Sequence, residues 1–183
     1  MLEVNALNND PAVLRLRDVD AKHIAELLQR FGLKLTTVLA DKPIPGSFWG
    51  DDEAGLIGAA LFARSDTPLH SILHEACHWI TCAPGRRAAL HTDAADTQDE
   101  ENATCYLQIL LSDYIPGFGR ARGLKDMDAW GYTYRPIRHY VNEKRLKHPH
   151  PKTHLFVRIN QPKLLQPCAL CLCIFAKPKG CES

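Results

Sequence analysis

The chain has 183 residues, of which 45% are hydrophobic and 23% charged, the composition of a globular protein rather than a disordered or fibrous one. No apolar run approaches the roughly 20 residues that cross a bilayer, and the first residues are mixed and polar rather than a leader sequence. We therefore expect a cytoplasmic protein with no membrane partner. The seven cysteines show no framework spacing, which favours reduced thiols over disulfides.

Charge divides the chain into two regions. Residues 1–134 contain 12 Lys and Arg against 19 Asp and Glu, a net charge of −7, whereas residues 135–183 contain 10 against 2, a net charge of +8. The second region has no aspartate, is rich in His and Cys, and shows no clear periodicity. We predict a functional domain over 1–134 and a basic tail over 135–183 that is poorly ordered or out of frame. Without interleaved aromatic residues, the tail does not favour nucleic-acid binding.

The first half of the predicted domain reads as a helix followed by two strands. The apolar stripe over 19–31 predicts a helix, with Asp18 or Asp20 available as its N-cap. The β-branched segment 35–39 predicts one strand, and the apolar segment 56–63 predicts a second. Between them lies a turn-rich stretch with prolines, glycines and an acidic cluster.

A second helix is predicted over 69–80. Asp66 or Thr67 is expected to cap it, and Pro68 suits its first turn, where a missing amide proton has no consequence. The apolar residues of this segment recur at helical spacing and form a stripe that can pack against a core.

This second helix carries the pattern H-E-x-x-H at His74, Glu75 and His78. Histidines four residues apart project from one helix face about 40° apart, so both imidazoles can bind one metal ion. Glu75 then lies beside them as a base for a water on that ion. The pattern predicts a metal site with Glu75 as its catalytic residue.

A third helix over 97–114 is expected to supply the third ligand. Catalytic zinc sites usually take three protein ligands, and Glu100 continues the apolar stripe of this helix, so it is the first choice. Glu100 could instead close a capping box with Thr97. Glu101 and His91 are the alternative ligands. A shorter helix is predicted over 124–130.

These elements predict an α+β fold, with a small mixed or antiparallel sheet packed on the H-E-x-x-H helix and on the glutamate-bearing helix. The expected chemistry is metal-dependent hydrolysis, most readily of a peptide bond, so the expected partner is a peptide or protein substrate. Zn²⁺ is the expected ion and Fe²⁺ the alternative, because two histidines and one carboxylate suit both. Oligomeric state cannot be inferred from this pattern.

Part of the chain resembles a known family. A strand ending in FARSDTP, then HEACHW, then a glutamate-bearing helix is similar to the compact gluzincin-type domains of the ImmA/IrrE metallopeptidases. The resemblance covers about residues 55–117 and implies a zincin-like fold, with His74, His78 and Glu100 as ligands and Glu75 as general base. Five residues match the second part of that family's pattern: Glu100, Ala103, Tyr106, Leu110 and Leu111.

A second resemblance depends on fewer residues. The segment from His74 to Trp79, followed by Arg86 and Arg87, is similar to the elongation factor P hydroxylase family. It implies a non-haem iron hydroxylase acting on a lysine of a translation factor. A protein in which the metal only stabilises the fold is the third interpretation.

A few further side chains could contact a substrate. Arg86 and Arg87 could bind a substrate carboxylate, and Tyr106 is a candidate to stabilise an oxyanion, which needs a donor about 3 Å from the developing charge. His91 is a candidate for the same role. Each of these residues has an ordinary structural explanation as well, as packing or as solvated surface.

Overall fold

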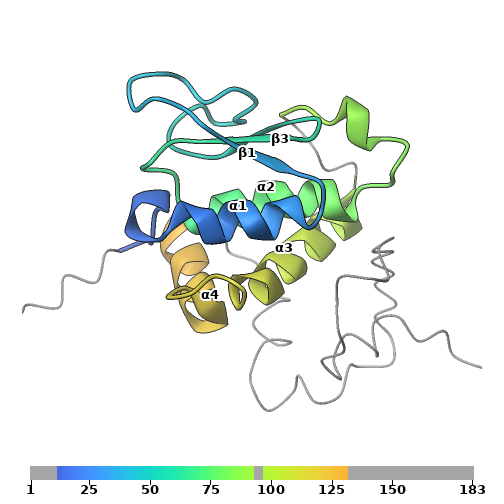
Figure 1. The fold of residues 1–183 in the computed structure, drawn as a ribbon. Helices are drawn as coiled ribbons and strands as arrows, with labels where there is room; N and C mark the ends of the chain where they lie inside the picture. Colours follow the sequence, from blue (N-terminus) through green and yellow to red (C-terminus); the bar gives the residue numbers. More distant parts are fainter. Residues whose placement is uncertain (1–11, 93–96, 132–183) are drawn as a thin grey trace, which may run out of the picture.

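The structure is a computed structural model that describes residues 12–92 and 97–131 (Figure 1). Across these residues the fold is α+β, as predicted, with four α-helices and one three-stranded sheet. The sheet forms one layer, α1 and α2 lie beneath it, and α3 and α4 lie farther from the sheet (Figure 1). The predicted boundary near residue 134 and the tail over 135–183 lie outside the described residues.

The first helix, α1 (Ala21–Gln29), follows a short 3₁₀ helix (Leu16–Asp18), and Asp20 is its N-cap. Of the two predicted caps it is Asp20 that acts, because its carboxylate accepts a hydrogen bond from the Lys22 amide. The buried side chains of α1 recur three and four residues apart, and the helix packs beside strand β1 (Lys34–Thr37).

The sheet is mixed, with β3 (Ala60–Ala63) between parallel β1 and antiparallel β2 (Gly55–Ile57). The prediction of one strand over 56–63 is wrong, because the chain reverses at Gly58 and forms a hairpin. Gly58 has φ +51°, a left-handed conformation that glycine adopts without a steric penalty. At Gly55 a Cβ atom would lie 2.0 Å from the Pro45 carbonyl oxygen, so glycine allows the preceding loop to approach the sheet closely.

Helix α2 (Leu69–Thr81) carries the H-E-x-x-H pattern and begins after Pro68, which is its N-cap. The prediction that Asp66 or Thr67 caps it is wrong, because both side chains bond to Arg64 instead. The Thr67 hydroxyl accepts the Arg64 amide at 2.9 Å, and the Asp66 carboxylate forms an ion pair with the Arg64 guanidinium at 2.9 Å. These contacts stabilise the turn that leads from β3 into α2.

Helix α3 (Gln98–Ser112) lies between α2 and α4 (Gly119–Trp130), and a 3₁₀ helix (Arg87–Ala89) precedes it. The Thr97 hydroxyl accepts the Glu100 amide, which is one of the two bonds of the capping box considered as the alternative role of Glu100. Because α3 packs on two sides, its buried residues cover most of its circumference rather than one stripe. They are Ala103, Thr104, Cys105, Leu107, Gln108, Ile109, Leu111 and Ser112. Helix α4 is five residues longer at its start than predicted.

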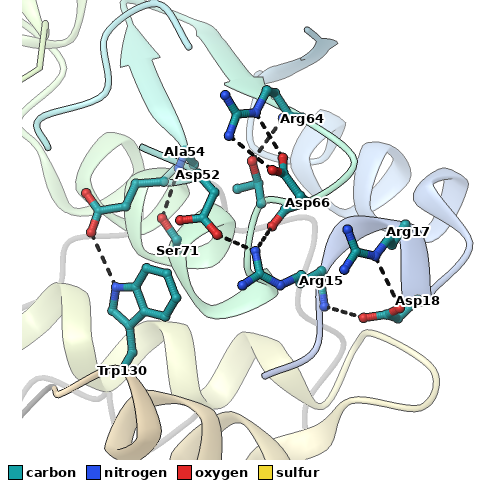
Figure 2. Close-up of polar contacts among 11 residues, drawn as sticks. Arg15, Arg17, Asp18, Asp52, Ala54, Arg64, Asp66, Ser71 and Trp130 are labelled. Carbon is teal, nitrogen blue, oxygen red and sulfur yellow. Dashed lines mark hydrogen bonds and ion pairs between the residues drawn. The ribbon is translucent and has the colours of Figure 1, made fainter. Parts of the chain in front are cut away.

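Polar contacts hold the loop before β2 against the start of α2 and the segment before α1 (Figure 2). Arg15 bonds to Asp52 and to the Asp66 carbonyl oxygen, and the Ser71 hydroxyl accepts the Ala54 amide at 3.0 Å. The adjoining Leu14 amide donates to the buried Asp126 of α4 at 2.8 Å. These bonds place residues 52–54 beside the first turns of α2.

Candidate metal centre

The imidazoles of His74 and His78 lie side by side on the face of α2 that packs against α3. Both side chains are buried, and their Nε2 atoms are 3.0 Å apart. The histidines are one helical turn apart, which places both rings on one face. Two neutral imidazole nitrogens this close to each other can serve as a pair of donors to one metal ion.

The Nδ1 atoms of the two histidines are held by polar side chains of α3. His74 Nδ1 lies 2.7 Å from Gln108 Oε1, and His78 Nδ1 lies 3.4 Å from the Thr104 hydroxyl. The amide nitrogen of Gln108 donates to the Met127 sulfur at 3.0 Å, which leaves the amide oxygen facing His74. An Nδ1–H bonded to Gln108 leaves the Nε2 lone pair of His74 available to an ion, the usual arrangement at histidine metal sites.

Glu101 is the glutamate of α3 that faces the histidine pair. Its Oε1 is 3.4 Å from His74 Nε2, and its Oε2 is 3.5 Å from His78 Nε2. Glu100, the predicted first choice, instead forms an ion pair with Arg86 at 2.9 Å. The expectation that Glu100 faces the histidines is therefore wrong, because successive residues on a helix are about 100° apart and α2 lies on the Glu101 side.

Glu75 is held beside this group with one carboxylate oxygen, Oε2, buried and without a hydrogen-bond partner among the described residues. A carboxylate oxygen of Glu75 and one nitrogen of each histidine all lie within 4.8 Å of one another. Burial, together with the charges of Glu53 and Glu101, raises the pKa of Glu75 to about 8. Such a carboxyl group binds a proton tightly once it is ionised, as a general base must.

Burial also keeps the histidines neutral. It lowers the pKa of His78 to about 3, with a smaller contribution from His74, and it lowers the pKa of His74 against the opposing effects of Glu101 and Gln108. A neutral imidazole is the form that binds a metal ion. The site is therefore able to bind an ion at neutral pH without first losing protons from its histidines.

The separations among these donor atoms are close to those around one metal ion. Donors that are 2.0–2.2 Å from a tetrahedral ion lie about 3.3–3.6 Å from each other. The two Nε2 atoms are slightly closer, at 3.0 Å, whereas one oxygen of Glu101 lies 3.4 Å from His74 and its other oxygen lies 3.5 Å from His78. Two imidazoles and one carboxylate also match the ligands of catalytic zinc sites.

The predicted substrate-contacting arginines have structural partners. Besides the ion pair of Arg86 with Glu100, the Arg87 guanidinium donates to the carbonyl oxygens of Ile80 and Cys82 and lies over the Trp79 ring. Arg87 thus satisfies carbonyl groups at the C-terminal end of α2.

Two other candidates lie away from the histidine pair. Tyr106 is about 140° around α3 from Glu101, and burial raises its pKa while the charge of Arg120 lowers it. His91 is exposed, bonds to the Thr92 hydroxyl at 2.6 Å, and belongs to none of the donor clusters found among the described residues.

Sequence reasoning missed four residues at the site: Glu53, Thr104, Cys105 and Gln108. The last three share a helix face with Glu101, so their spacing of three and four residues could have indicated them together. No local signal indicates Glu53, which comes from the loop before β2. It accepts a hydrogen bond from the Trp130 indole at 3.4 Å, and its pKa is raised by burial.

Comparisons of the chain with sequence models of protein families, with curated proteins and with solved structures found no match. Among the described helices, none combines the length and the apolar character needed to cross a membrane. The possible chemistry of the site is therefore argued from its own geometry.

Proposed function

We propose that the protein is a metal-dependent hydrolase, a small zinc metallopeptidase of zincin-like type that cleaves a peptide bond. His74, His78 and Glu101 bind the ion, and Glu75 is the general base. Glu101 replaces Glu100 in this assignment because of its contacts with both imidazoles.

One observation carries the proposal: two neutral nitrogens and a carboxylate converge at separations close to those of donors to one ion. The bonds from Gln108 and Thr104 support it, because they orient the rings without occupying the facing nitrogens. The exposed fraction of the Glu101 side chain, 26%, is larger than the 10% of His74 and the 7% of His78. Glu101 is therefore the donor most exposed to solvent.

A divalent ion at these donors supplies Lewis-acid activation of the scissile carbonyl and of a water molecule. Glu75, whose buried Oε2 has no hydrogen-bond partner among the described residues, would take a proton from the attacking water and give it to the leaving amine. The apolar face of α2 holds the helix rigidly against the core, and this keeps Glu75 and the histidines in register.

A second candidate function is favoured by the donor set itself. Two histidines and one carboxylate are also the ligands of non-haem ferrous oxygenases, so an iron hydroxylase could use His74, His78 and Glu101. A third candidate is a protein in which the ion only stabilises the fold. The identity of the bound metal distinguishes the hydrolase from the hydroxylase. The activity of a Glu75 variant distinguishes both from a protein with a purely structural ion.

The first test is the metal content of protein purified without a metal-binding tag. We expect about one zinc per chain by elemental analysis. Oxygen-sensitive iron in its place, together with oxygen uptake, would favour the hydroxylase. Purified protein that binds neither ion, even after incubation with each, would contradict a metal centre of any kind.

The second test uses Glu75→Gln, which removes the base and keeps the shape of the side chain. We expect normal metal content and an unchanged circular dichroism spectrum, with loss of peptide cleavage measured by mass spectrometry on a peptide library. Wild-type cleavage by this variant would rule out Glu75 as the base. A library that neither protein cleaves, with an ion that resists exchange, would indicate a structural role.

A further inference from the structure

We infer that Cys105 is a further donor to the ion, so that the centre contains one sulfur ligand besides its two nitrogens and one carboxylate. This inference rests on the proposed metal centre and adds a fourth protein ligand to it, so the water of the proposed hydrolysis would be a fifth ligand, a coordination number that catalytic zinc can reach. It implies a preference for zinc, ferrous iron and other ions that accept sulfur, over magnesium and calcium.

The position of the thiol relative to the other donors carries the inference. Cys105 lies one turn after Glu101 on α3, and its Sγ is 3.3 Å from Glu101 Oε1. Donor atoms of Cys105, Glu101 and His74 all lie within 4.8 Å of one another. A sulfur about 2.3 Å from zinc lies about 3.5 Å from its neighbouring donors, so the Sγ–Oε1 separation already fits a shared ion.

Burial and the charge of Glu101 raise the pKa of the Cys105 thiol when no ion is bound, but charge balance favours the thiolate once a divalent ion is present. Two neutral imidazoles and the Glu101 carboxylate leave one positive charge of a divalent ion uncompensated in a largely buried site. Buried charge is unfavourable unless it is paired. The Cys105 thiolate supplies the second negative charge, and its proton passes to solvent as the sulfur binds.

A second cysteine in the same interface provides a comparison. Cys77 of α2 and Cys105 of α3 are both fully buried, with 0% of each residue exposed. Among the described residues, only Cys105 of these two belongs to a cluster of possible metal donors. Cys77→Ala is therefore a matched control for Cys105→Ala, because both changes remove one buried sulfur from the contact between α2 and α3.

The test is cobalt substitution in the full-length protein. Co²⁺ bound by a thiolate shows an intense sulfur-to-cobalt charge-transfer band in the near ultraviolet, which nitrogen and oxygen donors do not produce. We expect this band in the wild type and in Cys77→Ala, and its loss in Cys105→Ala. Zinc affinity, measured by competition with a chelator, should fall more than about tenfold in Cys105→Ala only. Circular dichroism checks that each variant is folded.

The outcomes separate this inference from the proposed function. Stoichiometric cobalt without the band in the wild type would overturn the sulfur ligand and leave the His74, His78 and Glu101 centre intact. A band that persists in folded Cys105→Ala would assign the sulfur ligand to another cysteine, and this would also overturn the assignment of Cys105. Absence of cobalt binding in the wild type would overturn both. If Cys105→Ala does not fold, Cys105→Ser serves, because a hydroxyl of similar size should bind cobalt without the band.

Discussion

The two faces of α2 are built from opposite kinds of side chain. The face toward the sheet and α1 is apolar and buried, and it includes Leu69, Ile72, Leu73, Ala76 and Ile80. The face toward α3 and α4 buries His70, His74 and His78. Both faces exclude water, but only the apolar one gains stability from doing so.

A helix selected for stability alone would not bury several ionisable groups on one face. Burying them forces the histidines into their neutral form and leaves Glu75 Oε2 without a hydrogen-bond partner among the described residues. Such an arrangement lowers the stability of the metal-free protein and is typical of functional sites. The apolar face of α2 thus fixes the helix in the core, and this fixes the positions of the histidines on its other face.

The largest expected effect is on metal affinity, and it concerns neighbouring glutamates. Glu101→Ala should lower zinc affinity by well over about a hundredfold, because loss of residues that merely orient a ligand already costs about 10–100-fold. Glu100→Ala is the matched control and should leave zinc affinity unchanged, since Glu100 pairs with Arg86. Competition with a chelator measures both. If Glu100→Ala lowered zinc affinity and Glu101→Ala did not, Glu100 would be the third ligand.

On the apolar face, Ile72→Ala should lower the free energy of unfolding by about 2–5 kcal/mol, because it leaves a cavity in the core. Ile72 is 0% exposed. Leu39, which is 70% exposed, provides the control, and Leu39→Ala should change stability by less than about 0.5 kcal/mol. Urea denaturation measures both variants. If Ile72→Ala abolished zinc binding while leaving stability unchanged, the two faces would not divide their roles as described.

The polar face should make the metal-free protein sensitive to acid. The pKa of His70 is lowered by burial to about 3, from 6.5 when unfolded, so the unfolded chain binds a proton that the folded chain does not. Stability from this group is present above pH 6.5 and is lost as pH falls toward 3, by roughly 2 kcal/mol at pH 5. His78, whose pKa is also lowered to about 3, likewise makes the folded protein less stable as pH falls. Glu75 acts in the opposite direction: because its pKa is raised to about 8, its contribution to stability is lost as pH rises from about 4.5 to 8.

Urea denaturation in the presence of a chelator, at several pH values between 4 and 7, measures this dependence. His70→Leu should flatten the curve by about 1.4 kcal/mol per pH unit between pH 4 and 6, the contribution of one proton. An acid sensitivity equal to that of the wild type would mean that His70 is protonated in the folded protein.

The smallest expected effect is at the end of α2, where the two faces meet the following loop. Arg87→Ala should lower the free energy of unfolding by about 1–2 kcal/mol, because it removes bonds from a charged donor to the carbonyl oxygens of Ile80 and Cys82. Zinc affinity should stay unchanged. Arg17→Ala, which alters an exposed ion pair, should cost less than about 1 kcal/mol. Loss of peptide cleavage in Arg87→Ala without loss of stability would restore its predicted contact with the substrate.

Much of the fold was predictable because its signals are local. The α1 stripe, the Asp20 cap, the α2 helix and the Thr97 cap each depend on residues within one or two turns of one another. The H-E-x-x-H spacing likewise places His74 and His78 on one face by helix geometry alone. The hairpin at Gly58 was missed because the apolar run of 56–63 does not reveal where a strand ends.

Tertiary structure alone decided which residues of α3 and of the loops meet the histidines. Periodicity shows that a helix has a buried side, but it cannot show which neighbour covers that side, and α3 is covered by both α2 and α4. For this reason the apolar stripe pointed to Glu100, whereas packing brings Glu101 to the imidazoles. Glu53 lies near enough to Glu75 for its charge to raise the pKa of Glu75. Its loop is held there by the bond of Arg15 to Asp52 and by the bond of the Ala54 amide to Ser71, which join residues far apart in the chain. What the sequence determined was the pair of histidines on one face of α2 with Glu75 beside them; the residues of α3 that meet them were decided by how the helices pack.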